Sequence, residues 1–163
     1  FKIHKKCIIK PLFGNGGKNV FFSSFKDPNL DVIIEKFLED EEHFIIQKFI
    51  KNVSKGDKRI LLIDGEPVGA INRLPSTTQI RANIHVGGKA KKTKLTEKEI
   101  KICEKIKDTL KNRGLFFAGI DVIDDFLTEI NVTSPTCIRE INYFNKDNIA
   151  AKFWDSFESK YFS

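Results

Sequence analysis

Residues 121–131 read Asp-Val-Ile-Asp-Asp-Phe-Leu-Thr-Glu-Ile-Asn, a pattern typical of two β-strands joined by a short turn. A two-residue turn would pair Asp121 with Thr128 and point Glu129 toward the opposite face of the hairpin. A three-residue turn over residues 124–126 would instead pair Asp121 with Glu129. The choice between these turns decides which face of the sheet carries the acidic side chains.

The apolar residues favour the three-residue turn, because that register gathers four of them on one core-facing side: Ile120, Val122, Ile130 and Val132. The opposite face then holds three oxygen-bearing side chains, those of Asp121, Glu129 and Asn131, since alternate residues of a strand share a face. Two carboxylates and one amide oxygen, without His or Cys, suit a hard cation that keeps bound water, namely Mg²⁺. The alternative is a polar strand edge that faces solvent.

A second candidate site lies near the start of the chain, where residues 10–17 read Lys-Pro-Leu-Phe-Gly-Asn-Gly-Gly. Strands are expected on either side, at 6–12 and 19–23. Lys10 would place a positive charge beside an anion, and the backbone N–H groups of three glycines could approach it closely: Gly14, Gly16 and Gly17. The pattern is neither a Walker A loop nor a Rossmann fingerprint. We therefore expect either a hairpin that covers phosphates or a plain tight turn.

Apolar periodicity predicts the remaining elements. Helices are expected at 30–41, 97–113 and 148–161, and strands at 44–50, 59–63, 67–74, 116–123 and 127–132. The dipeptide Asp64-Gly65 between two apolar runs indicates a hairpin turn. Hairpins and helices mixed in this way favour an α+β fold, with antiparallel or mixed sheets and flanking helices.

The helix at 97–113 has the clearest boundaries. Thr96 is expected as its N-cap, and Glu99 would complete a capping box. Its predicted core-facing stripe consists of Ile100, Cys103, Ile106 and Leu110. Residues 74–94, which precede it, lack periodicity, and we expect them to form a long loop that acts as a lid.

Three arginines are candidate anion ligands, because a guanidinium group can bind two oxygens of a phosphate or carboxylate at once. Arg59 and Arg73 lie on the predicted hairpin strands, and Arg81 lies in the long loop. Each of them alone would more often be an ordinary surface residue.

The composition is that of a globular protein, with 163 residues, 40% of them hydrophobic, 31% charged, and a net charge of +6. No apolar run reaches the roughly 20 residues that span a bilayer, and no signal peptide is visible, so no membrane partner is expected. The basic run at 89–94 has no interleaved aromatic residue, which argues against a nucleic-acid partner. Three cysteines at scattered spacings indicate a reducing, cytoplasmic setting. Because the chain has no Met and begins at Phe1, we expect a fragment of a longer protein.

Three stretches resemble the bacterial-type glutathione synthetases, which have the ATP-grasp fold. They are 64–68 (Asp-Gly-Glu-Pro-Val), 114–121 (Gly-Leu-Phe-Phe-Ala-Gly-Ile-Asp) and 127–140 (Leu-Thr-Glu-Ile-Asn-Val-Thr-Ser-Pro-Thr-Cys-Ile-Arg-Glu). The resemblance covers nearly the whole chain but only the C-terminal half of a family member. It implies a partial ATP-grasp fold, with part of the nucleotide-binding subdomain at 1–50 and a C-terminal subdomain with the metal site at 51–163. It also implies an enzyme that uses ATP to join γ-glutamylcysteine to glycine through an acyl phosphate.

The same resemblance implies roles for individual residues. The nucleotide would be bound by Lys10, Gly14, Gly16, Gly17, Asp57 and Asn83, and by a linker beside adenine made of Gln47, Lys48, Phe49 and Ile50. The metal ligands would be Asp121, Glu129 and Asn131, holding Mg²⁺ or, as an alternative ion, Mn²⁺. Arg59 and Arg73 would lie near the transferring phosphate, and Arg81 and Asn83 in the loop that covers the substrate.

The sequence leaves other functions open. Another ATP-grasp peptide ligase is one alternative, because residues 76–83 lack the paired glycines common in the family. A non-catalytic nucleotide-binding fragment is another, because half of a normal active site is missing, and for that reason we expect this chain alone to be a poor ligase. An RNA-binding module is the third, suggested by the net positive charge. The complete enzyme is expected to form a homo-oligomer.

Overall fold

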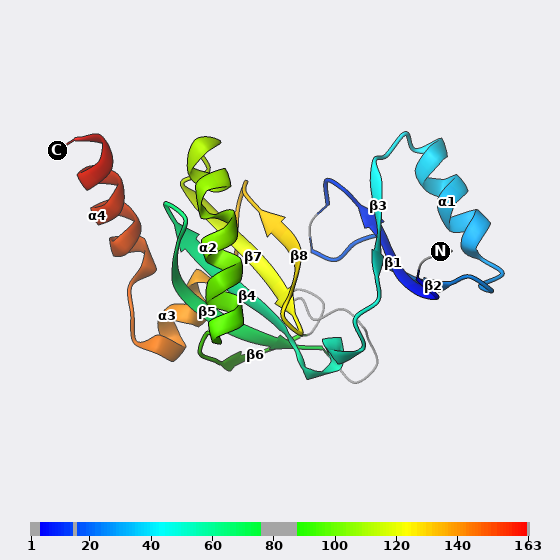
Figure 1. Cartoon of the computed structure of the whole chain (residues 1–163), viewed down its shortest axis with the longest axis horizontal. Helices are drawn as coiled ribbons and strands as arrows, with labels where there is room; N and C mark the ends of the chain where they lie inside the picture. The colour runs from blue at the N-terminus through cyan, green and yellow to red at the C-terminus, as the bar shows by residue number, and fades with distance from the viewer. Residues whose placement is uncertain (1–3, 15, 76–87, 163) are drawn as a thin grey trace. The chain divides into compact units, whose positions relative to one another are not determined.

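The computed structural model describes residues 4–14, 16–75 and 88–162. The chain divides into two compact units, Phe1–Lys51 and Asn52–Ser163, and each contains one antiparallel β-sheet (Figure 1). The nucleotide-binding and metal-binding roles expected for two such parts remain predictions. Within the described residues, no helix is both long and apolar enough to cross a membrane.

The first unit is a three-stranded sheet with one helix packed against it. Its strands are β1 (Lys6–Pro11), β2 (Phe21–Ser24) and β3 (Phe44–Lys48), in the order β2-β1-β3, and its helix is α1 (Leu30–Glu39). Alternate residues of β1 point into the core, where Cys7 and Ile9 are fully buried with Phe37 of α1. The Phe37 ring stacks on Phe44 with the ring centroids 5.0 Å apart. The predicted strands and helix of this unit are confirmed, with small differences at their ends.

The second unit is built on a five-stranded sheet of order β6-β5-β4-β7-β8, in which every neighbouring pair is antiparallel. A short 3₁₀ helix, η1 (Lys51–Lys55), precedes the first strand, and the strands are β4 (Asp57–Ile63), β5 (Glu66–Leu74), β6 (Lys89–Lys92), β7 (Phe117–Ile123) and β8 (Phe126–Asn131). Asp64 and Gly65 form the predicted hairpin turn, with φ of 48° and 77°. Positive φ at both central residues is the geometry that matches the twist of the flanking strands.

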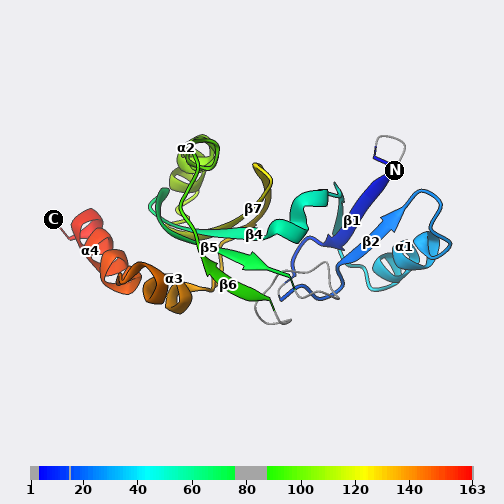
Figure 2. The ribbon, with the colours of Figure 1, turned by 90° about the horizontal axis from the view of Figure 1, so that it is seen from below.

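Different helices cover the two faces of this sheet (Figure 2): α2 (Glu97–Asn112) lies on one face, and α3 (Ile138–Asn145) with α4 (Ile149–Tyr161) lies on the other. Strand β4 alternates between them, because Ile60 packs under α2 whereas Leu61 packs under α3 and α4. Both faces of β4 are therefore apolar along most of its length. By the same alternation, Asp57 and Arg59 share the face of α3.

Helix α2 begins with the predicted capping box. The Glu99 backbone N–H donates to Thr96 Oγ1 over 3.3 Å, and the Thr96 N–H donates to Glu99 Oε2 over 2.8 Å. The predicted apolar stripe is wrong at one position, because Ile100 is 40% exposed and Ile102 packs against the core in its place. Glu99 is also buried. The Glu99 carboxylate accepts a further hydrogen bond from Lys58 Nζ over 2.6 Å.

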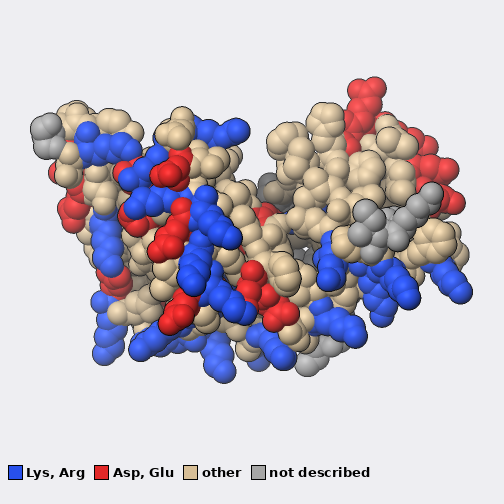
Figure 3. Space-filling model, viewed as in Figure 1, with Lys and Arg blue, Asp and Glu red and all other residues tan. Residues whose placement is uncertain are grey.

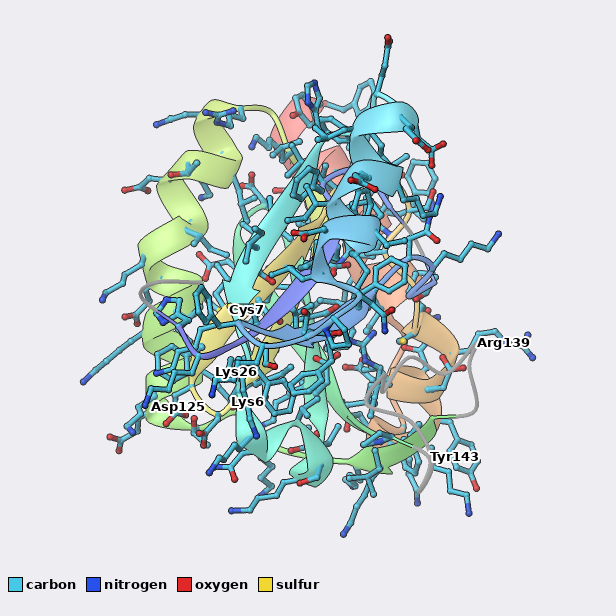
Figure 4. The ribbon with its side chains drawn as sticks, turned by 90° about the vertical axis from the view of Figure 1, so that its right-hand side faces the viewer. Lys6, Cys7, Lys26, Asp125, Arg139 and Tyr143 are labelled. Atoms are coloured by element: carbon cyan, nitrogen blue, oxygen red, sulfur yellow. The ribbon has the colours of Figure 1, made fainter. Side chains whose placement is uncertain are left out.

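Two elements lie where the sequence predicts none. Strand β6 occupies the end of the expected 74–94 loop and pairs with β5 as an edge strand; residues 76–87 of that loop lie outside the described part of the chain. Helix α3 follows the break at 133–137, and its Ile141 is fully buried. The side chains of Arg139 and Tyr143 extend outward from α3 (Figure 4), and Tyr143 is 79% exposed.

Candidate functional site

Four charged side chains are buried together at one end of the second unit's sheet. Asp57 and Arg59 lie on β4, Arg73 on β5 and Asp121 on β7, and none of the four is more than 7% exposed. The strand register brings them together, because Asp57 is opposite Arg73 and Arg59 is opposite Asp121. Charged groups are seldom buried to this extent unless they are paired.

The carboxylate of Asp121 is the acceptor shared by both arginines. Arg59 binds it with two nitrogens, Nε to Oδ1 over 2.5 Å and Nη2 to Oδ2 over 3.0 Å. Arg73 Nη2 lies 2.9 Å from the same Oδ2, and it donates a second bond to Asp57 Oδ2 over 2.5 Å. The result is a chain of alternating charges, Arg59–Asp121–Arg73–Asp57, with no net charge when all four groups are ionised.

The two carboxylates of this network have opposite pKa shifts. Burial raises the pKa of Asp57 to about 7, and the negative charge of Asp121 adds to that effect. Burial also disfavours ionisation of Asp121, but the guanidinium groups of Arg73 and Arg59 outweigh it and hold the pKa of Asp121 below its usual value. Burial alone would lower the pKa of Arg73, but Asp121 and Asp57 keep it above the ordinary arginine value. Asp121 is therefore the permanently charged acid of the site.

The β7–β8 hairpin places Glu129 beside Asp121, but not through the predicted turn. The turn has two residues, Asp124 and Asp125, both with positive φ, and Ile123 pairs with Phe126. A bulge then inserts one extra residue, Thr128, so that Val122 is opposite Leu127 while Asp121 is opposite Glu129. The Thr128 hydroxyl donates to the Asp121 carbonyl over 3.1 Å.

The predicted Asp121–Glu129 pairing is thus confirmed, and the predicted three-residue turn is wrong. The bulge moves Glu129 to the face opposite Leu127, which packs under α2. Ile130 does pair with Ile120 as expected, but Ile130 and Val132 are 43% and 42% exposed instead of buried. β8 is the edge strand, and the apolar cluster under α2 includes its Leu127 but not Ile130.

The predicted metal ligands Asp121, Glu129 and Asn131 all carry oxygen, the donor that a hard divalent cation prefers. Asn131 lies opposite Gly119, and its Nδ2 donates to the Gly119 carbonyl over 3.4 Å, which leaves the amide oxygen as the group available to a ligand. Asp121 accepts three N–H contacts, and a carboxylate offers about four acceptor positions, so one remains. Among the described residues, no three His, Cys, Asp or Glu side chains are grouped to hold a metal ion. Any cation here would therefore depend on the amide and on ligands from outside the chain.

Two supporting residues of the site escaped sequence reasoning. Arg59 Nη1 also donates to Thr136 Oγ1 over 3.5 Å, which ties the site to the segment before α3. Gly119 allows that segment to approach the sheet, because a Cβ at this position would lie 2.8 Å from Pro135 Cβ and 3.4 Å from Arg59 Cδ. A lone glycine in the middle of a strand signals such a close approach, but it does not reveal which segment approaches.

In the first unit, the predicted glycine-rich hairpin is present between β1 and β2. Gly16 and Gly17 adopt φ of 64° and 73°, a region that glycine enters without strain. Lys10 is half-buried on β1, opposite Ile45 of β3. Gly14 lies in the same connection, beyond the end of β1 at Pro11.

Of the expected adenine linker, Gln47 and Lys48 belong to β3, and Phe49 and Ile50 follow it. The Phe49 N–H already donates to the Lys6 carbonyl over 3.0 Å. The contacts of all these residues with a nucleotide remain predictions. Arg81 and Asn83 lie outside the described residues.

The lysines of the basic run have a structural role on β6, where Lys89, Lys91 and Lys92 lie on the edge strand. Lysines on a sheet edge hinder pairing with other chains. Along α2, by contrast, Figure 3 shows basic and acidic side chains interspersed.

The three cysteines are free and buried. Burial raises the pKa of the Cys103 thiol to about 11, and it also raises that of Cys137. Both thiols are therefore poorly suited to act as nucleophiles at neutral pH.

Comparison with known proteins identifies the family of the chain. Residues 1–146 match the family model of the prokaryotic glutathione synthetase, ATP-grasp domain. The glutathione synthetase of Brucella melitensis is 55% identical over 154 residues, which are 94% of this chain and 49% of that protein. That of Mesorhizobium japonicum is 53% identical over the same shares. The chain spans about half the length of the curated relatives that it matches.

Solved structures support the same fold at low sequence identity. D-cycloserine synthetase DcsG is similar with a TM-score of 0.74 at 15% identity, covering 96% of this chain and 56% of that protein. The ATP-grasp ligase PsnB is similar with a TM-score of 0.65 at 17% identity, covering 97% of this chain and 47% of that protein. The predicted α+β ATP-grasp fold is thereby confirmed. The chain belongs to the ATP-grasp domain family of the prokaryotic glutathione synthetases.

Proposed function

We propose that the chain is the ATP-binding and metal-binding part of a ligase that joins γ-glutamylcysteine to glycine and produces glutathione, ADP and phosphate. The observation that carries the proposal is the buried Arg59–Asp121–Arg73 arrangement, which stands beside Glu129 in a chain more than half identical to glutathione synthetases. Positive groups that suit phosphate and oxygen ligands that suit a cation lie at one end of one sheet, as phosphoryl transfer requires.

The reaction has two steps in this proposal. The cysteine carboxylate of the dipeptide attacks the γ-phosphorus of ATP, ADP leaves, and an acyl phosphate forms. The glycine amine then attacks the acyl carbon, loses a proton and displaces inorganic phosphate. Catalysis in such a reaction consists mainly of positioning the reactants and neutralising negative charge.

Each part of the chain has a defined task in this scheme. Arg59 and Arg73 stabilise the transferring phosphate, and their orientation is fixed in advance by the carboxylates they bind. Asp121, Glu129 and Asn131 would hold Mg²⁺ or Mn²⁺, which would neutralise phosphate charge when bound.

In the first unit, Lys10 and the glycine-rich hairpin of Gly14, Gly16 and Gly17 bind phosphate oxygens, and the linker at residues 47–50 lies beside adenine. Arg81 and Asn83 belong to the segment that covers the substrate. The complete enzyme acts on small molecules as a homo-oligomer in the cytoplasm, and the three free, buried cysteines agree with a reducing compartment.

Two other functions have a specific observation in their favour. Residues 76–83 depart from the family's usual glycine pattern, which favours a related peptide ligase with a different acceptor. The coverage of about half of each relative favours a nucleotide-binding part that is not catalytic on its own.

The test uses the complete gene product that contains this sequence, together with the 163-residue chain alone. Each is incubated with ATP, Mg²⁺, γ-glutamylcysteine and a panel of amine acceptors, and ADP and peptide products are quantified. The proposal expects glutathione from the complete protein with glycine as the preferred acceptor, and little product from the chain alone. Preference for another acceptor would favour the related ligase, and ADP binding without any product would favour the non-catalytic function.

A further inference from the structure

Arg73 is held by two carboxylates, one of which also binds Arg59 and one of which does not. Its Nη2 carries two N–H groups, one directed to Asp121 Oδ2 and the other to Asp57 Oδ2. The Asp121 oxygen is also bound by Arg59, whereas among the described residues Asp57 Oδ2 accepts a hydrogen bond from Arg73 alone. Asp57 is therefore the group that distinguishes the position of Arg73 from that of Arg59.

Within the described residues, two buried polar atoms of this pair have no hydrogen-bond partner: Arg73 Nε and Asp57 Oδ1. Atoms buried without a partner in this way are costly, and they lie out of reach of a ligand. Because Nη2 is already occupied by two carboxylates and Nε is buried, Nη1 is the nitrogen of Arg73 that is left to bind an incoming oxygen. A phosphate oxygen is an acceptor that a guanidinium binds strongly.

Asp57 itself is poorly placed to bind a ligand directly. Its residue is 7% exposed, Oδ2 is committed to Arg73, and Oδ1 is buried. Sequence reasoning, by contrast, places Asp57 among the nucleotide contacts. The structure provides a different role, because Asp57 stands directly across the ladder from Arg73 on β5.

We propose that Asp57 is a positioning residue that holds the Arg73 guanidinium with its Nη1 directed at an oxygen of the transferring phosphate, and that Asp57 does not contact the nucleotide. This inference rests on the proposed function, which supplies the phosphate. It requires only an acceptor oxygen at position 57, so a neutral side chain with such an oxygen serves nearly as well.

The experiment replaces Asp57 in the complete gene product. Asp57→Ala removes the acceptor, Asp57→Leu removes it while filling nearly the same space, and Asp57→Asn keeps an oxygen. With Ala or Leu, kcat for ADP formation is expected to fall about tenfold to a hundredfold while KM for ATP changes less than about threefold, because a transition-state contact is lost. Asn is expected to restore kcat to within about threefold of the wild type.

Two further measurements separate positioning from a general loss of structure. In an Arg73→Lys background, Asp57→Ala should lower kcat by no more than about twofold, because the group through which it acts is already altered. Glu99→Gln is the matched control: it breaks the buried Lys58–Glu99 pair on the opposite face of the same sheet and should leave kcat within about twofold of wild type. Urea unfolding of every variant establishes that it is folded.

Binding of ADP, measured calorimetrically, gives a readout that does not depend on turnover. ADP lacks the transferred phosphate, so Asp57→Ala should change its Kd by less than about threefold. A tenfold weaker Kd, or an Asp57→Ala effect of equal size in the wild-type and Arg73→Lys backgrounds, would overturn the inference. A wild-type protein that forms no ligated product overturns the proposed function instead, while the ADP measurement still decides whether Asp57 contacts the nucleotide.

Discussion

Substitution of Asp121 by asparagine is the perturbation that the structure makes most costly. The carboxylate accepts contacts from two guanidinium groups whose side chains are at most 6% exposed. Asparagine keeps the shape but removes the charge, and it turns one acceptor into a donor that faces other donors. Loss of one partner from a buried ion pair costs about 3–5 kcal/mol. Because Asp57 remains as a second carboxylate, we expect the lower part of that range, about 3 kcal/mol.

Urea denaturation at pH 7 measures this loss in the chain itself. The only tryptophan, Trp154, lies in α4 of the second unit, so its fluorescence reports the unfolding of the unit that contains Asp121. With an m-value of about 1–2 kcal/mol per M, a loss of about 3 kcal/mol lowers the urea midpoint by about 1.5–3 M.

Asp125→Asn is the matched control, since it makes the same chemical change in an ion pair with Lys98 that is largely exposed. Exposed pairs contribute about 0–1 kcal/mol, so its midpoint should move by less than about 1 M. If Asp121→Asn shifts the midpoint no further than Asp125→Asn does, the buried network does not have the energetic role that its geometry indicates.

Three further predictions concern the same unit. Glu129→Gln in the complete gene product should lower Mg²⁺-dependent turnover about a hundredfold, or about 3 kcal/mol of transition-state stabilisation, with an unchanged urea midpoint; steady-state kinetics would contradict the metal assignment if turnover were normal. Burial raises the pKa of Asp57 from 3.8 to about 7, so the folded chain binds this proton more tightly than the unfolded chain. The free energy of unfolding should therefore fall as the pH rises from 4 to 7. Asp57→Asn should flatten that slope in urea titrations, and an unchanged slope would refute the assignment. Gly119→Ala should destabilise the unit by about 1–3 kcal/mol in the same assay, because its Cβ would lie 2.8 Å from Pro135 Cβ; a neutral effect would show that the segment yields freely.

Local signals in the sequence were sufficient for much of this fold. The capping box at Thr96 and the turn at Asp64-Gly65 depend on residues close in sequence, and both form as expected. The pairing of Asp121 with Glu129 was also predicted from the sequence, through a register favoured by the apolar residues.

Features that depend on tertiary contacts could not be obtained in this way. The bulge at Thr128 reaches the expected register through a tight turn, and no pattern of apolar residues distinguishes it from a longer turn. Strand β6 consists of three lysines and an alanine, and it forms because the edge of β5 offers backbone partners. The position of Ile100 was misjudged because Lys58, distant in sequence, draws Glu99 into the interface.

The candidate site was predicted as a set of residues and not as a network. Arg59, Arg73 and Asp121 were each identified, but the sequence gives no indication that the two arginines share one carboxylate. That arrangement arises from the order β5-β4-β7. Arg73 of β5, Asp57 and Arg59 of β4, and Asp121 of β7 thereby come to the same end of the sheet.

Transfer of an oxygen isotope tests the central claim most directly. The complete gene product is supplied with γ-glutamylcysteine labelled with ¹⁸O in its cysteine carboxylate, together with glycine, ATP and Mg²⁺, and the inorganic phosphate is analysed by mass spectrometry. Formation and aminolysis of an acyl phosphate leave one carboxylate oxygen on phosphate, so the account predicts one labelled oxygen in phosphate for each glutathione formed. Unlabelled phosphate, or glutathione formed without ADP, would contradict it.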